Sequence, residues 1–339
     1  MNMLSFLLGA PIKAQRAAKG LFADANDLDA LKTYYESEIA PLCRKFENQR
    51  LGALKQARKR LYLGAAIYLG LLLLAFPMMR TNADFAPFIW MLAIMFAFAV
   101  WHIGSRPLRQ YSGAVRAEIY PRIFRFFGPD FVFCKGQDMG LRHFKNASIL
   151  PSYDKARFDD GILGSYRGVE IVINEIHLLK EVRDKDNRTK QITAFKGLTI
   201  SLSSHKPFKG HTVVIRARGA ITNFFSDSHS GLERVRLEDP RFEKQFDVFS
   251  TDQIEARVLL TTAFMERMLE LAGFFQSRIQ CAFYQDRLLI TLESSKNRFE
   301  QASIFDGATF EYEFSQIHAE MKQLFAIIEL LKLNEYTGL

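Results

Sequence analysis

The chain has 339 residues, of which 48% are hydrophobic and 24% are charged, and it carries a formal net charge of +8. This length suits one to three domains, and the ordinary composition excludes a disordered chain. The charge alone would permit nucleic-acid binding, but two stretches, 44–60 and 105–125, together hold +10 and leave −2 for the remainder. Because both stretches flank apolar segments, their charge indicates contact with lipid headgroups and argues against a nucleic-acid partner.

The first 60 residues predict a cytoplasmic helical region. Residues 1–15 are too short in apolar length for a signal peptide, and they are expected either to fray or to lie on the membrane. In the second case the side chains that dip in are Leu4, Phe6, Leu7 and Leu8. Acidic residues in 24–29 mark a helix start, and apolar residues recur at helical spacing through 28–60. Pro41 is expected to kink or divide this helix.

Two uncharged apolar runs of about 19 residues, Leu61–Met79 and Phe85–Ile103, predict a transmembrane helical hairpin over 61–103. Their only titratable side chain with a charged form near neutral pH is His102, at the end of the second run. The loop between them, Arg80–Asp84, holds one charge of each sign, whereas both outer flanks are strongly basic. The positive-inside rule therefore predicts that both termini are cytoplasmic.

A further helix is expected over 104–127, because Pro107 suits a first helical turn and apolar residues then follow at steps of three and four. This helix and the one over 28–60 flank the hairpin on the same side of the membrane. We expect them to pair as an antiparallel stalk. The alternative is that each apolar stripe packs on the soluble domain.

Residues 128–339 predict a cytoplasmic α+β domain with a mostly antiparallel sheet and helices covering one face. Alternating apolar residues indicate strands at 169–178, 198–203 and 213–218, which are expected to form a three-stranded meander. A helix capped at Ser250–Asp252 and running to about Phe274 follows, with Gln253 and Glu255 placed for a capping box. A hairpin over 279–292 and a last helix, about Phe314–Lys332, complete the domain.

Motifs for catalysis or cofactor binding are missing from the sequence. It has no phosphate-binding glycine loop, no nucleophile elbow and no zinc-protease motif, and its three cysteines, Cys43, Cys134 and Cys281, lie far apart. His205 and His211 flank a turn, but a metal site there would need carboxylates from elsewhere. We therefore assign no catalytic, cofactor-binding or metal-binding residues and no cofactor.

The densest polar stretch, residues 237–257, leaves open the hypothesis that the protein is an enzyme. Paired carboxylates such as Asp239, Asp252 and Glu255 could divide acid and base roles. The structural reading is favoured, because Asp252 sits where a helix needs a cap and Glu255 lies in a first helical turn. Arg257 is expected to pair with Glu238 or Asp239 and so fix the loop.

Several short motifs then occur in order: Phe195–Leu198 (FKGL), Phe208–Gly210 (FKG), Leu237–Lys244 (LEDPRFEK), Ser250–Arg257 (STDQIEAR), Phe264–Arg267 and Leu331–Asn334. Together they resemble the bacterial family catalogued as domain of unknown function 3137, over roughly Asp154–Asn334. The resemblance implies two spans near the N-terminus, a cytosolic domain and a bacterial inner-membrane location, but no activity. Where the family has proline after a Leu-Thr pair, this chain has Thr262.

These observations predict a membrane-anchored bacterial interaction or scaffold protein that is not an enzyme, bound to the lipid bilayer and to a membrane or cytosolic protein. Candidate contact surfaces are the loop around Phe224–Phe225 and the charged turn Asp184–Thr189. The alternatives are an enzyme using the 237–257 carboxylates and a protein that binds anionic lipid headgroups. The sequence leaves open whether the chain forms a homo-oligomer.

Overall fold

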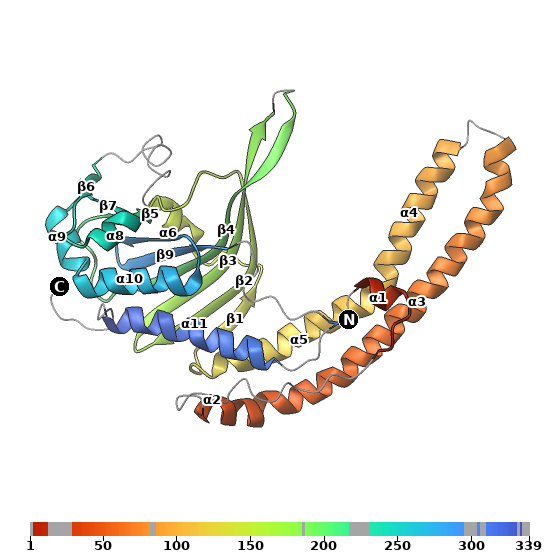
Figure 1. Ribbon diagram of the computed structural model, residues 1–339, viewed down its shortest axis with the longest axis horizontal. Helices are drawn as coiled ribbons and strands as arrows, with labels where there is room; N and C mark the ends of the chain where they lie inside the picture. Colours follow the sequence, from red (N-terminus) through yellow and green to blue (C-terminus); the bar gives the residue numbers. More distant parts are fainter. Residues whose placement is uncertain are drawn as a thin grey trace. The chain divides into compact units, whose positions relative to one another are not determined.

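The computed structural model describes residues 3–12, 29–81, 86–184, 187–216, 231–294, 304–305, 310–330 and 333 (Figure 1). The chain forms two compact units. Unit 1 comprises residues 1–123 and 301–316, and unit 2 comprises residues 124–300 and 317–339. The two units are described separately.

Unit 1 is built from helices. The N-terminal helices are α1 (Met3–Leu7), α2 (Asp29–Tyr34), a π-helical turn η2 (Tyr35–Ile39), α3 (Ala40–Thr81), α4 (Ala86–Gly104) and α5 (Arg106–Arg125), and the first residues of α11 (Glu311–Leu330) join them. With 42 residues, α3 is about 63 Å long. It therefore contains both the predicted stalk segment and the first predicted span.

The helices before and after the predicted spans pair antiparallel along their length, as expected for a stalk. Contacting pairs are Tyr34 with Arg122, Lys45 with Glu118, Phe46 with Tyr111, Leu61 with Gly104, Gly64 with Val100 and Tyr68 with Phe96. Along these pairs the residue numbers rise from 34 to 68 in the first helical arm and fall from 122 to 96 in the second, so the two arms are antiparallel. One continuous hairpin therefore runs through the stalk and the predicted spans.

Pro41 lies directly after an irregular turn of this hairpin. A proline has no N–H to donate and its ring crowds the carbonyl four residues earlier, so a regular helix through Pro41 is costly. The residues before Pro41 form the π-helical turn η2, in which the N–H of Ala40 bonds to the carbonyl of Tyr35, five residues back. The prediction that Pro41 divides the helix is confirmed.

The N-terminal helix α1 packs on the stalk. Phe6 is fully buried among Leu54, Ala57, Leu61 and Leu108, which corrects the expectation that it dips into lipid. Arg58 lies 4.9 Å from the Phe6 ring centroid and donates a 2.6 Å bond to the carbonyl of Ala10, and the Tyr62 hydroxyl donates to the carbonyl of Leu7. Leu8, in contrast, is 78% exposed.

A late segment of the chain covers the same side of the stalk. Ile304 and Phe305 pack against the α1 cluster, and the Phe305 ring lies 5.5 Å from that of Phe6. The carbonyl of Ile304 accepts a 3.1 Å bond from Arg50, which is 2% exposed. Glu47 accepts two further bonds from Arg50, of 2.6 and 2.8 Å.

Two stretches of helix are long and apolar enough to cross a membrane, Asp29–Pro77 and Pro87–Arg125. In their most apolar 18-residue windows only 6% and 17% of the residues are buried, whereas a core helix of a soluble protein is mostly buried. Leu73, Leu74, Ile94 and Phe98 are all between 68% and 77% exposed. This apolar surface lies on the segments that the sequence assigns to the hairpin.

Unit 2 is built on one nine-stranded sheet with the order β1-β2-β3-β4-β9-β8-β5-β7-β6, in which every described pairing is antiparallel. The strands are β1 (Val132–Lys135), β2 (Lys155–Tyr166), β3 (Val169–Arg183), β4 (Thr189–Ser203), β5 (Thr212–Arg216), β6 (Glu233–Val235), β7 (Phe246–Ser250), β8 (Ile279–Tyr284) and β9 (Arg287–Glu293). The predicted three-stranded meander is wrong in the position of its third strand, β5. The β8–β9 hairpin inserts between β4 and β5, so only β3 and β4 are neighbours.

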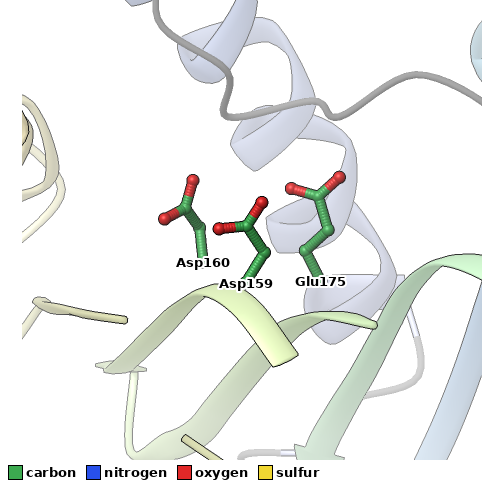
Figure 2. A group of neighbouring side chains, drawn as sticks. All are labelled: Asp159, Asp160 and Glu175. Atoms are coloured by element: carbon green, nitrogen blue, oxygen red, sulfur yellow. The ribbon is translucent and has the colours of Figure 1, made fainter. Parts of the chain in front are cut away.

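Strand β2 contains a bulge in its middle. Phe158 faces Ile176 and Gly161 faces Asn174, so Asp159 and Asp160 together oppose the single residue Glu175 on β3. Figure 2 shows the side chains of all three acidic residues on the same side of these strands.

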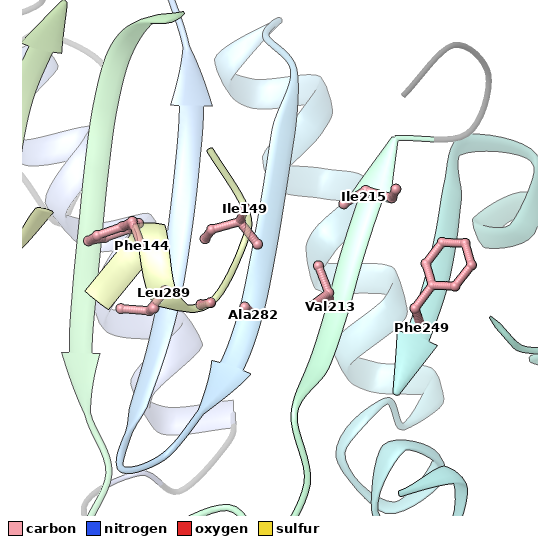
Figure 3. Close-up of a cluster of buried hydrophobic side chains, with 8 residues drawn as sticks. Phe144, Ile149, Val213, Ile215, Phe249, Ala282 and Leu289 are labelled. Atoms are coloured by element: carbon pink, nitrogen blue, oxygen red, sulfur yellow. The ribbon is translucent and has the colours of Figure 1, made fainter. Parts of the chain in front are cut away.

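Helices cover both faces of the sheet, and not one face as expected. On one face Phe275 of α10 (Thr262–Phe275) and the α11 residues Ile317, Met321 and Leu324 pack with Ile173, Leu198, Ile200 and Leu292. On the other face lies α6 (Leu141–Asn146) with the loop after it, whose Phe144 and Ile149 join Val213, Ile215, Phe249, Ala282 and Leu289 (Figure 3). The central strands are therefore buried on both sides.

The expected helix from Asp252 to Phe274 is divided into α9 (Gln253–Leu259) and α10. Asp252 caps α9, as predicted, and Thr261 caps α10 by accepting a 3.2 Å bond from the N–H of Phe264. Thr262 is thus the first residue of α10. Proline is favoured at the first position of a helix, so residue 262 is a place where proline would fit.

Candidate functional site

Two of the resembling motifs, Phe208–Gly210 and Ser250–Arg257, meet in unit 2 at a junction between the loop 204–211 and α9. Glu255 accepts hydrogen bonds from two successive backbone N–H groups, those of Lys209 at 2.7 Å and Gly210 at 2.5 Å. The expected capping box is therefore wrong, since Glu255 holds a distant loop and Gln253 bonds to Glu233. Glu255 links the FKG motif to the STDQIEAR motif.

Gly210 is needed at this junction because there is no room for a side chain. A Cβ at Gly210 would lie 2.8 Å from Cβ of Asp252 and 3.1 Å from Oε2 of Glu255. Thr251 holds the next residue, because its hydroxyl accepts a 2.9 Å bond from the N–H of His211 and its own N–H donates to the His211 carbonyl. Motif residues 45 positions apart thus fix one loop.

Gly197 of the FKGL motif has a similar structural role in the sheet. It lies on β4 opposite Glu293 of β9, at a φ of +156°. A Cβ at Gly197 would overlap the carbonyl oxygen of Leu292. The close approach of the two strands at this point requires glycine.

The LEDPRFEK motif forms the cap of a short helix, α8 (Pro240–Gln245). Asp239 accepts from the N–H groups of Arg241 at 2.8 Å and Phe242 at 3.3 Å, and Glu243 accepts from the N–H of Leu237 at 2.8 Å. The hydrogen bond from the Arg241 guanidinium lowers the pKa of the Asp239 carboxyl from its usual value. The ionised form of Asp239 is therefore favoured.

Arg257 does not have the partner that the sequence suggested. Its guanidinium donates to the backbone carbonyl of Gln253 at 3.0 Å and to that residue's side-chain oxygen at 3.3 Å. Asp239 pairs instead with Arg241, two residues away. A partner one turn away along α9 replaces the expected long-range pair.

Asp239, Asp252 and Glu255, on which the enzyme alternative depends, are all engaged by backbone N–H groups. Two of them cap helices and the third clamps a loop. A general base needs an oxygen that can reach a substrate proton, whereas these oxygens stabilise local backbone. The geometry of the 237–257 segment is that of a structural junction.

The acidic residues of the β2 bulge are a group that the sequence analysis missed. Oxygens of Asp159, Asp160 and Glu175 lie within 4.8 Å of one another, and Asp160 and Glu175 are 1% and 3% exposed. Carboxylates in this arrangement suit hard cations. All three residues also make further interactions within the protein, so we treat the group as part of the fold. The signal in the sequence was the polar pair Asn174–Glu175 within an apolar run.

The remaining predicted residues are dispersed. His211 bonds to the carbonyl of Ala147 at 3.1 Å and stacks edge-on with Tyr284, so its ring packs within the fold. Cys43 and Cys281 are buried and Cys134 is half-buried. The loop around Phe224–Phe225 lies outside the described residues, as do Lys185 and Asp186 of the turn Asp184–Thr189.

Residues 193–333 match the sequence model of a family described as "Protein of unknown function (DUF3137)". The chain resembles this family. The match begins later than the expected Asp154 and ends where expected, and it contains all six motifs except the end of the last one. The DUF3137 description carries no activity, substrate or cofactor.

Two further comparisons add little. A search of curated proteins finds no match. Among solved structures, the crystal structure of the mycobacterial trehalose monomycolate transport factor A, TtfA, is similar over 62% of this chain and 91% of that one, with 12% identity and a TM-score of 0.36. A TM-score this low supports no argument about fold or function.

Proposed function

We propose that this protein is a non-enzymatic interaction module held at the cytoplasmic face of a bacterial inner membrane. The observation that carries the proposal is the exposed apolar surface of α3 and α4 in unit 1. A soluble protein rarely exposes so large an apolar patch, whereas a bilayer covers it. The basic residues at 44–60 and 105–125 support a topology with both ends of the hairpin inside the cell, by the positive-inside rule.

The use of the motif carboxylates supports an interaction role over an enzymatic one. Asp239, Asp252 and Glu255 bind backbone N–H groups of their own fold. The carboxylates of the resembling motifs therefore stabilise the fold of unit 2. A domain whose motif residues stabilise its fold suits binding to another macromolecule.

The end of the β3–β4 hairpin is the element best suited to binding. Towards the turn, residues 180–183 of β3 and 189–192 of β4 form ladder pairs only with each other among the described strands. Figure 1 shows this ribbon extending past the rest of the sheet. A lone two-stranded ribbon is marginal in water, and its open edges can accept another strand. The predicted contact turn Asp184–Thr189 lies at its tip.

One face of this ribbon combines positive charge with apolar side chains. Lys180 pairs with Ile192 and Val182 with Lys190, so these four side chains share a face, while Glu181 lies on the other. Ile192 is 42% exposed. The face fits an acidic segment that also carries apolar residues.

In-cell photocrosslinking tests the proposal. A photoreactive residue at Ile192 should give one discrete heavier product, and the same residue at Val258, which is 44% exposed on α9, should give none. Lys190→Glu should reduce the Ile192 product, because it reverses the charge beside the probe. Equal crosslinking at positions 192 and 258, or a product indifferent to Lys190→Glu, would count against the ribbon as the binding element.

A second candidate function, recognition of anionic lipid, is favoured by a groove at the junction of α4 and α5.

A further inference from the structure

A shallow groove lies where the second predicted span, Phe85–Ile103, ends. Its lining residues are His102, Ile103, Arg106, Arg109 and Gln110, which come from the last turn of α4 and the first turns of α5. All five belong to unit 1. The groove therefore sits at the level where a bilayer would present its headgroups.

Arg109 is fixed in position by its neighbours. It donates a 2.7 Å bond to the backbone carbonyl of His102 and a 2.6 Å bond to the hydroxyl of Ser105. The Ser105 hydroxyl in turn donates to the carbonyl of Trp101. These bonds hold the end of α4 to the start of α5, so that a positive charge is preorganised beside the groove.

Arg106 and Gln110 supply the donors that face an incoming ligand. They are exposed and lie four residues apart on α5, so they share one side of that helix. Among the residues that the structure describes, no carboxylate forms an ion pair with Arg106 or Arg109.

An apolar track continues from the groove along α4. His102 stacks on Phe98 at 6.3 Å between ring centroids, and Ile94 lies a further four residues back. Phe98 and Ile94 are 70% and 68% exposed, and Ile103 is 61% exposed. Charged donors thus lie at one end of an exposed apolar surface. This arrangement matches a phospholipid, whose charged headgroup lies at one end of its acyl chains.

We propose that this groove binds the phosphate headgroup of an anionic phospholipid, with Arg106 and Gln110 as direct donors and Arg109 as the fixed charge beside them. The acyl chains lie along Phe98 and Ile94. This inference rests on the proposed membrane anchoring and adds a specific ligand to it. A free phosphate would gain the charged contacts but not the apolar track.

The test is lipid retention by the full-length protein, purified in mild detergent from membranes that contain phosphatidylglycerol and phosphatidylethanolamine. The probe is the ratio of these two lipids in the purified protein, measured by mass spectrometry against the ratio in the total membrane. Wild type should be enriched in phosphatidylglycerol. Arg106→Gln should lower the enrichment about fivefold, the factor expected for about 1 kcal/mol per lost arginine contact.

Two further variants separate the groove from general positive charge. Gln110→Leu leaves every charge in place and should lower the enrichment in the same direction as Arg106→Gln. Arg125→Gln removes an equal charge from the far end of α5 and should leave the enrichment unchanged. Melting temperature and gel-filtration profile confirm that each variant is folded.

Equal losses in Arg106→Gln and Arg125→Gln would overturn the groove, because the effect would then be general charge. No loss in Arg106→Gln would overturn it as well. Displacement of the lipid by millimolar inorganic phosphate would overturn the lipid assignment in favour of a small anion. Each of these results leaves the protein in the membrane fraction, whereas failure of the anchoring proposal would place the wild type in the soluble fraction.

Discussion

At the scale of single residues, two glycines in unit 2 explain motifs that had no assigned role. Gly210 lies against Asp252 and Glu255, and Gly197 lies against the backbone of β9. In each case the missing side chain lets two segments approach closely. Their place in the resembling motifs therefore follows from packing.

Gly197→Ala should destabilise unit 2 by about 2–3 kcal/mol, because the new methyl group collides with the carbonyl of Leu292 and the strands must separate. Gly273→Ala is the matched control. It lies within α10 with no atom within 4 Å of the added methyl group, so it should be neutral or stabilise by up to about 1 kcal/mol. Urea unfolding of both variants checks the prediction, and equal midpoints would contradict it.

At the scale of elements, the sequence predicted the local patterns and missed the partners that lie far away in the chain. The β8–β9 hairpin and the last helix follow from apolar periodicity, which reports burial of one face. The two long apolar helices follow from uncharged runs of about 19 residues, and the pairing of their flanks follows from the hairpin. Periodicity carries no information about strand order, so the insertion of β8 and β9 beside β4 was not predictable. The break between α9 and α10 was visible only as a Leu-Thr pair before Thr262.

The candidate site shows the same limit. Asp252 as a helix cap follows from local chemistry and was predicted. The hydrogen bonds that Glu255 accepts from Lys209 and Gly210 join residues more than 40 positions apart. Asp239 pairs with Arg241 and not with Arg257 because of the geometry of the loop. Local rules therefore identified the important residues but not their partners.

The ion pair between buried Arg50 and Glu47 should control the stability of the stalk. Glu47→Gln removes the carboxylate that bonds to the buried guanidinium and should cost about 3–5 kcal/mol, whereas the joint change Arg50→Met with Glu47→Leu should cost far less. Lys45→Gln, which breaks the exposed pair with Glu118, is the control and should cost less than about 1 kcal/mol. Thermal unfolding of the detergent-solubilised protein measures all three. A larger loss in the Lys45 variant would show that burial is not the deciding factor.

At the scale of the whole molecule, the proposed topology makes residues 80–84 external and unit 2 internal. A membrane-impermeant maleimide should label Asn82→Cys in intact spheroplasts and should label native Cys134 only after the membrane is opened. The two other cysteines should not interfere. Burial raises the pKa of the Cys43 thiol to about 12 and raises that of Cys281, so almost no reactive thiolate is present at neutral pH.

Labelling of Cys134 in sealed spheroplasts would contradict the topology. Recovery of the protein in the supernatant after high-speed centrifugation without detergent would contradict the membrane anchor itself. The two readouts therefore test separate parts of the proposal.

The contact between Arg50 and Ile304 also has a consequence for biosynthesis. A ribosome adding about 5–20 residues per second needs about 13–50 s to travel the 254 positions between them. During that interval the nascent hairpin has neither the Ile304 carbonyl that accepts from Arg50 nor the Phe305 ring that packs on Phe6. The earliest-made helices are thus among the last to be completed, and premature termination anywhere before codon 304 would yield an anchor without its closing segment.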